Sequence, residues 1–236
     1  MGFVESVRGF SNSVSRTSKK WTTIVRANVS GDRTAIPLAL LESIQAGTLA
    51  YRYRGRILEK NPFDLALYAL LISTLRPRTI IELGSRYGGS AEWFADQALV
   101  NNIDTQVFSF DINQTNEATR PNLHFGSADI HQLELSSLPE VLATAERPLL
   151  ISEDGPHTFS GSLAALRFFD NHMMPGDYMV IEDGNLTNLG YWGFGGGPTK
   201  ALKVFFSETK NSYRVDREYC DFYGKNATWN VNGWIT

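Results

Sequence analysis

Residues 78–95 read RTIIELGSRYGGSAEWFA, and this stretch decides the fold of the chain. It opens with a short β-branched run at residues 79–81, which is typical of a strand buried on both faces. A glycine-bearing loop follows at residues 84–89, and residues 90–96 then alternate apolar and polar side chains as a helix does. The stretch therefore predicts a strand, a tight turn and a helix, the first βα unit of a nucleotide-binding sheet.

The glycine spacing of this loop discriminates between ligands. A dinucleotide site needs G-x-G-x-x-G so that the backbone can approach a pyrophosphate, but here Gly84 is followed by Ser85, and the next glycines are Gly88 and Gly89. Glu82 at the strand end would repel a phosphate and attract an amine. The motif E-L-G-x-x-x-G resembles the first motif of class I methyltransferases, which bind S-adenosylmethionine (SAM), a ligand with an ammonium and a sulfonium but no phosphate.

The resemblance implies a cofactor site around this loop. The residues that it assigns to the cofactor there are Glu82, Gly84, Ser85, Tyr87, Gly88 and Gly89. Asp111 follows a second predicted strand at residues 105–110, where a carboxylate can accept hydrogen bonds from both ribose hydroxyls. Ser127 and Ala128 follow a third strand at 123–125, and the resemblance places them at the adenine edge. The alternatives are a tight turn without ligand and, for Asp111, a surface carboxylate.

Composition limits the class of protein. The chain has 236 residues, enough for one α/β domain with short additions, and its net charge of -3 is unclustered, which argues against a nucleic-acid partner. Cys220 is the single cysteine, so the chain has no internal disulfide and fits a reducing compartment. No apolar run approaches the roughly 18 residues of a membrane span. We therefore expect a soluble, cytoplasmic protein without stable membrane insertion.

The pattern along the chain predicts one α/β domain at residues 51–236, preceded by a basic N-terminal arm and helical cap at 1–50. The arm is expected to pack in an oligomer or to fray, with a membrane-surface contact as the alternative. Further strands are predicted at 149–152 and 178–181, and helices at 62–75, 130–145, 159–171 and 200–207. This alternation predicts a mostly parallel, doubly wound sheet. Residues 213–222 and 228–235 are expected to form an antiparallel strand pair that finishes it.

Carboxylates follow two neighbouring predicted strands. Asp154 comes after the strand at 149–152, and Glu182 and Asp183 come after the strand at 178–181. Because parallel strands place their carboxyl ends at one edge, these side chains are expected to lie within reach of one another. Clustered carboxylates repel unless a cation or a proton intervenes, and oxygen ligands favour Mg²⁺. A softer metal is disfavoured, since Cys220 is alone and the four histidines show no ligand spacing.

Two further motifs, ISEDGPH at residues 151–157 and GDYMVIEDG at 176–184, carry a family resemblance. Together with residues 76–96 they resemble the cephalosporin hydroxylase and rhamnosyl O-methyltransferase family, over roughly residues 53–184. The resemblance implies a Rossmann-like class I fold that binds SAM and Mg²⁺, with Asp154, Glu182 and Asp183 as metal ligands. It implies a homo-oligomeric O-methyltransferase that acts on a hydroxyl of a sugar or a glycosylated natural product. Asp154 is thereby expected to contact both the cofactor and the metal ion.

His157 lies three residues after Asp154, the offset at which sugar O-methyltransferases of this type carry a general base. A sugar hydroxyl does not ionise unaided at neutral pH, and an imidazole with a pKa near 6.5 can take its proton. We therefore predict His157 and Asp154 as the catalytic residues, a structural histidine being the alternative for His157. His124, His131 and His172 are expected to be structural.

Two other functions stay open at this point. One is a hydroxylase-type tailoring component, disfavoured because the chain has no H-x-D or H-x-E to begin a two-histidine, one-carboxylate iron site. The other is a non-catalytic SAM-binding module. The five glycines and three aromatic residues of residues 185–197 predict a mobile lid at the sheet edge.

Overall fold

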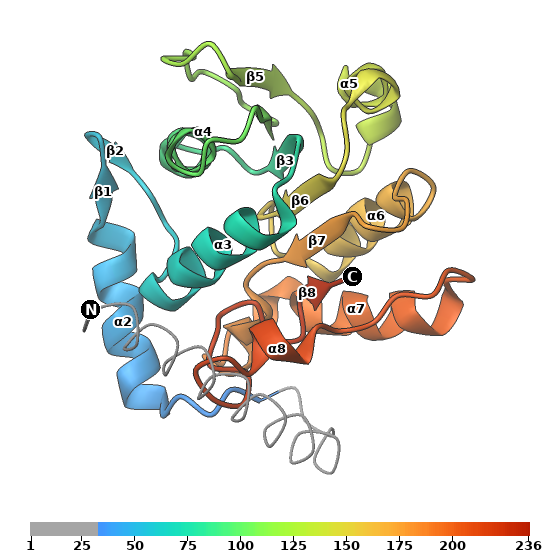
Figure 1. Ribbon diagram of the computed structural model, residues 1–236. Coiled ribbons are helices and arrows are strands. Elements are labelled where there is room, and N and C mark those ends of the chain that lie inside the picture. Colours follow the sequence, from blue (N-terminus) through green and yellow to red (C-terminus); the bar gives the residue numbers. More distant parts are fainter. Residues whose placement is uncertain (1–32) are drawn as a thin grey trace, which may run out of the picture. The chain divides into compact units, whose positions relative to one another are not determined.

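A six-stranded sheet forms the centre of the part of the chain that the computed structural model describes, residues 33–236 (Figure 1). Its strand order is β5-β4-β3-β6-β7-β8. The strands are β3 (Thr79–Leu83), β4 (Gln106–Asp111), β5 (Leu123–Ser127), β6 (Leu149–Glu153), β7 (Tyr178–Ile181) and β8 (Trp234–Ile235). The first five run parallel and β8 pairs antiparallel with β7. The predicted doubly wound sheet is confirmed; residues 1–32 of the expected arm lie outside the described residues.

Strand β3 is the centre of this sheet. All five of its residues are buried, and it pairs in parallel with β4 on one side and β6 on the other. Ile80 is opposite Val107 and Leu150 in these pairs, so β-branched and aliphatic side chains meet across three strands. The parallel register brings the carboxyl ends of β3, β4, β6 and β7 to one edge, where ligands bind in such sheets.

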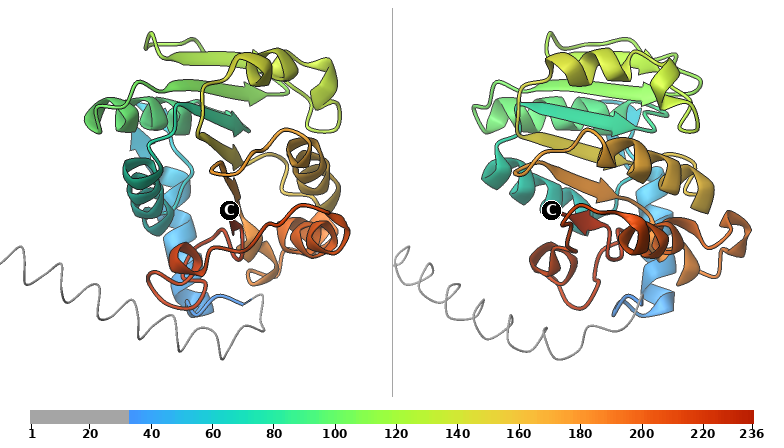
Figure 2. Two further views of the ribbon diagram at one scale, coloured as in Figure 1. Left: turned by 45° about the vertical axis from the view of Figure 1, so that its right-hand side comes forward. Right: turned by 90° about the vertical axis from the view of Figure 1, so that its right-hand side faces the viewer.

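Helices cover both faces of the sheet, as Figure 2 shows. One apolar cluster joins Ile80, Val107 and Leu150 to α3 (Pro62–Leu75), α4 (Gly89–Val100) and α8 (Arg217–Cys220). The other joins Ile81 and Ile151 to α5 (Leu138–Thr144), α6 (Phe159–Asp170) and α7 (Gly197–Glu208). Successive strand residues point to opposite faces, so adjacent residues such as Ile80 and Ile81 enter different clusters.

Two elements precede the first strand of the large sheet. Helix α2 (Leu38–Ala50) is followed by a small hairpin of β1 (Arg52–Tyr53) and β2 (Arg56–Ile57). Helix α3 then begins at Asn61, whose side chain accepts hydrogen bonds from the backbone N–H groups of Phe63 and Asp64. It ends at Arg76 in a left-handed conformation, before a proline that cannot continue the helix. Within residues 33–236 no helix is both long and apolar enough to cross a membrane.

Asp64 ties the start of α3 to the C-terminal segment. Its carboxylate, 2% exposed, accepts hydrogen bonds from Asn61, from the Thr228 hydroxyl and from the Trp229 backbone N–H, the last at 3.1 Å. Burial raises the pKa of Asp64 to about 7, although these donors oppose the shift. The carboxylate therefore orders a stretch that has no regular structure of its own.

Replacing Asp64 by alanine is expected to lower the free energy of unfolding by about 2–4 kcal/mol, because three buried donors lose their acceptor. Urea unfolding followed by circular dichroism measures this. Asp104→Ala is the matched control, since the Asp104 side chain is 79% exposed, and it should change stability by less than about 0.5 kcal/mol. Equal stability of the two variants would contradict the structural role of Asp64.

Two predicted elements differ in the structure. Residues 130–145 contain only a short 3-10 turn, η1 (Leu133–Leu135), and the short helix α5, whose first turn holds Pro139. The antiparallel pairing at the C-terminus is confirmed, but its members are β7 and β8 rather than 213–222 and 228–235. Asp216 instead caps α8 through the Glu218 backbone N–H, and a single bridge between Val215 and Ile235 remains. Residues 228–233 form bends and turns, and only Trp234 and Ile235 join the sheet, as β8.

Candidate active site

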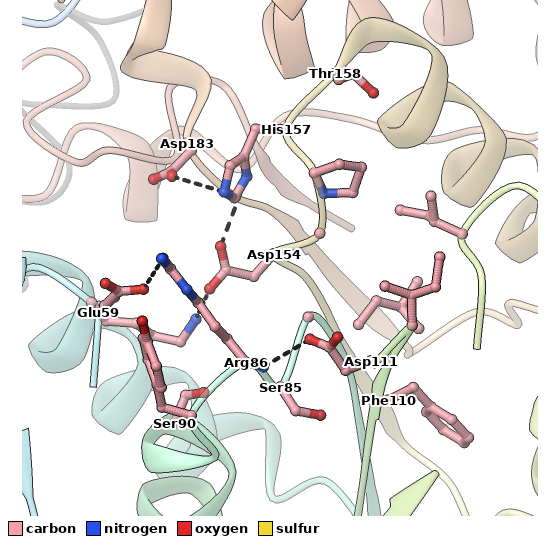
Figure 3. A pocket seen from close by; sticks show the side chains of 18 of the residues that line it. Glu59, Ser85, Arg86, Ser90, Phe110, Asp111, Asp154, His157, Thr158 and Asp183 are labelled. Carbon is pink, nitrogen blue, oxygen red and sulfur yellow. Dashed lines mark hydrogen bonds and ion pairs between the residues drawn. The ribbon is translucent and has the colours of Figure 1, made fainter. Parts of the chain in front are cut away.

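A cavity of about 690 Å³ opens at the carboxyl ends of the parallel strands. Gly84 and Ser85 line it after β3, Asp111 at the end of β4, and Asp154 after β6. Residues outside the sheet complete the wall: Gln45, Thr48 and Leu49 of α2, Glu59, Lys60, Leu186 and Trp229. Its volume lies within the usual range of roughly 300–1,000 Å³ for sites that bind small molecules. Figure 3 shows the polar side chains that meet there.

The turn after β3 is packed against the turn after β6. Gly84 has a φ of +101°, and a Cβ there would lie 2.0 Å from the carbonyl oxygen of Asp154. The Gly84 and Ser85 backbone N–H groups donate to the carbonyl of Phe110 at 2.7 and 3.1 Å. Only glycine permits both the left-handed conformation and this close approach. The two turns that carry the site are therefore held at a fixed distance.

Asp111 is held by backbone donors on both of its oxygens. Oδ2 accepts from the Arg86 N–H at 2.9 Å (Figure 3), and Oδ1 accepts from the Asn113 N–H at 3.0 Å. These bonds direct the carboxylate to the same end of the cavity as the glycine turn. Its remaining lone pairs can accept from a pair of vicinal hydroxyls.

The structure divides the residues assigned to the cofactor into two groups. Those that line the cavity are Gly84, Ser85, Tyr87, Asp111, Ala128 and Asp154, and those outside its lining are Glu82, Gly88, Gly89 and Ser127.

The second group has local reasons for its position. Glu82 is fully buried and accepts from the Ser109 hydroxyl at 2.5 Å, and burial raises the pKa of Glu82 to about 7. Gly88 and Gly89 begin α4 against the small hairpin, where a Cβ on Gly89 would lie 2.2 Å from the Ile57 carbonyl oxygen. Ser127 ends the edge strand β5 and is exposed.

Asp154, His157 and Asp183 form the polar centre of the cavity. Each offers one ligand atom, and these atoms lie within 4.8 Å of one another. His157 Nδ1 is 3.9 Å from Asp154 Oδ1, and Nε2 is 3.5 Å from Asp183 Oδ2 (Figure 3). Two carboxylates and one imidazole, each partly exposed, are a donor set that could hold a divalent cation.

Glu182 is placed differently from the expectation. It does not line the cavity, and its Oε1 accepts from Lys60 at 2.6 Å, from the Tyr68 hydroxyl at 2.7 Å and from the Ser152 hydroxyl at 2.5 Å. The structure thus groups Asp154 and Asp183 with His157, while Glu182 sits behind them and is joined to Asp154 through Lys60. All three donors contact the same oxygen of Glu182.

Lys60 is the functional residue that the sequence did not reveal. It lies in the connection between β2 and α3, beside the helix cap Asn61, and no periodicity marks it as buried. Its side chain is only 1% exposed, and Nζ is 2.9 Å from Asp154 Oδ2. The sole signal in the sequence is a lysine directly before an Asn-Pro helix start.

Burial and charge shift the pKa values of the whole group. Burial favours neutral Lys60 and neutral His157, but the surrounding carboxylates outweigh it and raise the pKa of both bases. Burial raises the pKa of Asp154, against the pull of Lys60, and burial followed by Asp154 raises the pKa of Glu182. The group therefore holds more negative charge than its environment favours, a condition that a bound divalent cation would relieve.

Other side chains lie around the cavity but outside the group of Asp154, His157 and Asp183. Arg86 reaches across it to an ion pair with Glu59 and lies 4.9 Å from the Tyr87 ring centroid (Figure 3). His131 lines the cavity, whereas His124 stacks on Phe108 and His172 on Phe168.

The glycine-rich segment contains two short 3-10 turns, η2 (Gly184–Thr187) and η3 (Trp192–Phe194). Leu186 lines the cavity, and the Phe194 ring lies edge-on to His157 with 6.5 Å between centroids. Trp192 is 74% exposed. A lid function for this segment stays a prediction.

A parallel sheet with a glycine turn after its central strand, an acidic residue after the next strand and paired strand-end carboxylates is the architecture of a class I methyltransferase. Comparison with known proteins agrees with this assignment. The family model Rhamnosyl O-methyltransferase/CmcI matches residues 47–236, and the chain belongs to this family. The predicted family and enzyme class are thus confirmed.

The individual relatives share less than a third of their residues with this chain over the aligned parts. The Rhamnosyl O-methyltransferase of Mycobacterium tuberculosis is 29% identical over 181 residues, 73% of each chain. That of Mycobacterium leprae is 28% identical over 169 residues, 66% of this chain and 71% of the relative. A solved structure of CmcI with Mg and SAM aligns with a TM-score of 0.64 at 25% identity, over 88% of each chain.

Proposed function

We propose that this protein is a Mg²⁺-dependent O-methyltransferase that uses SAM to methylate a hydroxyl of a sugar or of a glycosylated natural product. The observation that carries the proposal is the position of Asp154, His157 and Asp183 in the same cavity as the Gly84 turn and Asp111. The similar mycobacterial proteins are rhamnosyl O-methyltransferases, and the similar CmcI structure holds Mg and SAM. A rhamnoside is therefore the first acceptor to test.

The residues take different roles in this proposal. Gly84, Ser85 and Tyr87 form the cofactor wall after β3, and Asp111 accepts hydrogen bonds from the two ribose hydroxyls. Asp154 and Asp183 hold the metal ion, with Glu182 behind them. When bound, SAM supplies the methyl group and Mg²⁺ lowers the pKa of the acceptor hydroxyl. In this proposal one cavity would hold the cofactor and the metal ion side by side, with the acceptor hydroxyl next to both.

His157 is the proposed general base. Its Nδ1 forms no hydrogen bond within the described residues, its Nε2 lies 3.5 Å from Asp183 Oδ2, and the residue lines the cavity, where it would meet the hydroxyl proton. His157 would take that proton while the acceptor oxygen is aligned with the methyl group that SAM would supply. Asp183 and Asp154 raise the pKa of His157, so a cation that shares their charge would lower this pKa and favour the neutral imidazole, the form that can take a proton.

The first experiment is calorimetric titration with SAM, in Mg²⁺ and then in chelator. We expect micromolar binding to the wild-type protein and a loss of about 10- to 100-fold in Asp111→Ala, because two hydrogen bonds to a charged acceptor disappear. Asp104→Ala, in an exposed ion pair, is the control and should bind as the wild type does.

The outcomes separate the candidate functions. SAM binding followed by methylation of a rhamnoside in Mg²⁺ supports the proposal. SAM binding without methyl transfer to any acceptor points to a non-catalytic module or to a hydroxylase-type tailoring component. Absence of SAM binding in both conditions contradicts the cofactor site altogether. Homo-oligomer formation stays a prediction, which light scattering of the same sample can check.

A further inference from the structure

Lys60 places a fixed positive charge inside the acidic group. Its ammonium is 2.9 Å from Asp154 Oδ2 and 2.6 Å from Glu182 Oε1. The same nitrogen lies over the rings of Tyr68 and Phe94, 5.6 and 5.8 Å from their centroids. Carboxylates and aromatic faces thus surround it, and with 1% of the side chain exposed, little water reaches the charge.

This ammonium joins the carboxylates of two strands. Asp154 follows β6 and Glu182 follows β7, and among the described residues Lys60 is the one side chain with an ion pair to both. Without it, Glu182 would retain only the hydroxyl donors of Tyr68 and Ser152. The buried Glu182 and the partly exposed Asp154 would then face each other with no positive charge between them, which is unfavourable.

The same ammonium competes with a metal ion. Asp154 gives one oxygen to Lys60 and directs the other towards His157, within the group of atoms that can hold a cation. A positive charge beside a divalent cation repels it, and the ammonium already offsets part of the charge of the Asp154 carboxylate. Lys60 therefore attracts and stabilises the carboxylates, but it repels the metal ion that they would bind.

We propose that Lys60 is a positioning residue of the metal centre, an internal counter-ion that holds Asp154 and Glu182 in place before Mg²⁺ binds and weakens the binding of that ion. This inference rests on the proposed function, because it requires that the acidic group takes a divalent cation. It explains why a lysine, rather than an apolar residue, occupies a site with almost no exposure. Its consequence is a centre that is folded without metal and exchanges the ion reversibly.

The test compares Lys60→Met, which keeps the length of the stem and removes the charge, with Lys210→Met at an exposed position. In chelator, Lys60→Met should melt roughly 5–10 °C below the wild type, because it leaves buried carboxylates unpaired. Saturating Mg²⁺ should recover most of that difference. Calorimetry should show Mg²⁺ binding about tenfold tighter in Lys60→Met than in the wild type. Lys210→Met should match the wild type in all three measurements.

A second variant covers the case in which Lys60→Met does not fold. The double variant Lys60→Met/Glu182→Gln removes both charges of the pair and should melt above Lys60→Met in chelator. A double variant no more stable than the single one would overturn the counter-ion role. So would Lys60→Met with unchanged Mg²⁺ affinity and the same melting deficit in Mg²⁺ and in chelator.

These failures are distinct from a failure of the proposed function. Wild-type protein that binds neither Mg²⁺ nor SAM contradicts the methyltransferase site itself and, with it, the role of Lys60. Wild-type protein that binds both, with Lys60→Met indistinguishable from it, contradicts only the role of Lys60.

Discussion

Replacing Asp154 by asparagine is expected to lower methyl transfer by about 10³-fold or more while SAM still binds within a few-fold of the wild type. Asparagine keeps the size of the side chain and one oxygen, but it removes the charge that belongs both to the Lys60 pair and to the group with His157 and Asp183. The cofactor wall after β3 and the Asp111 carboxylate belong to other strands and keep their contacts. The loss should therefore appear in the rate and in Mg²⁺ affinity, not in SAM affinity.

Initial rates of S-adenosylhomocysteine formation on a rhamnoside measure the first effect, and calorimetry with Mg²⁺ and SAM measures the second. Asp104→Asn makes the same chemical change in an exposed ion pair and should keep wild-type rates. Chelator should lower the methyl-transfer rate of the wild-type protein to that of Asp154→Asn. Normal turnover by Asp154→Asn, or turnover of the wild type that chelator leaves untouched, would refute the metal assignment.

Replacing His157 by asparagine is expected to cost about 10²-fold or more in kcat, because the acceptor hydroxyl loses the group that takes its proton. The ring lies 3.5 Å from Asp183 and 3.9 Å from Asp154, so it is near enough to the carboxylates to serve either as a base or as a metal ligand. The two roles separate in one comparison. A base gives a lower kcat with unchanged Mg²⁺ affinity, whereas a ligand gives weaker Mg²⁺ binding.

His124→Asn is the matched control, since His124 is exposed and stacks on Phe108 in the edge-strand region. It should leave kcat unchanged. A His157→Asn variant with the kcat of the wild type across the whole pH range would remove His157 from the mechanism.

Local sequence patterns predicted the sheet and the placement of most strand-end residues. Three short-range signals predict the strands and their ends: the β-branched run at 79–81, the glycine turn, and the carboxylates that follow successive strands. Because the strands pair in parallel, the residues that follow them lie at the same edge of the sheet. The strand ends predicted a group of Asp154, Glu182 and Asp183, of which the structure brings Asp154 and Asp183 together; His157 was placed through its offset from Asp154 in the family resemblance. The positions of the strand ends could therefore be predicted from local sequence alone, without contacts between distant segments.

The rest depends on contacts between segments far apart in the chain. Glu182 is drawn away from the cavity by Lys60 and Tyr68, more than a hundred residues earlier. Glu82 is turned towards Ser109, a partner on another strand. The C-terminal aromatic residues read as strand formers, but Asp64 holds the backbone at 228–229 in a turn instead. Such long-range hydrogen bonds produce no periodic pattern of residues in the sequence, so local patterns do not predict them.

The contact between Gly84 and the Asp154 carbonyl has a consequence for how the protein can diversify. Any other residue type at position 84 would place its Cβ 2.0 Å from that oxygen, so we expect this position not to tolerate substitution. The wall formed by Gln45, Leu49 and Leu186 carries no such restriction, because those side chains belong to elements outside the sheet. A library aimed at a new acceptor should therefore vary this wall and leave the two turns untouched.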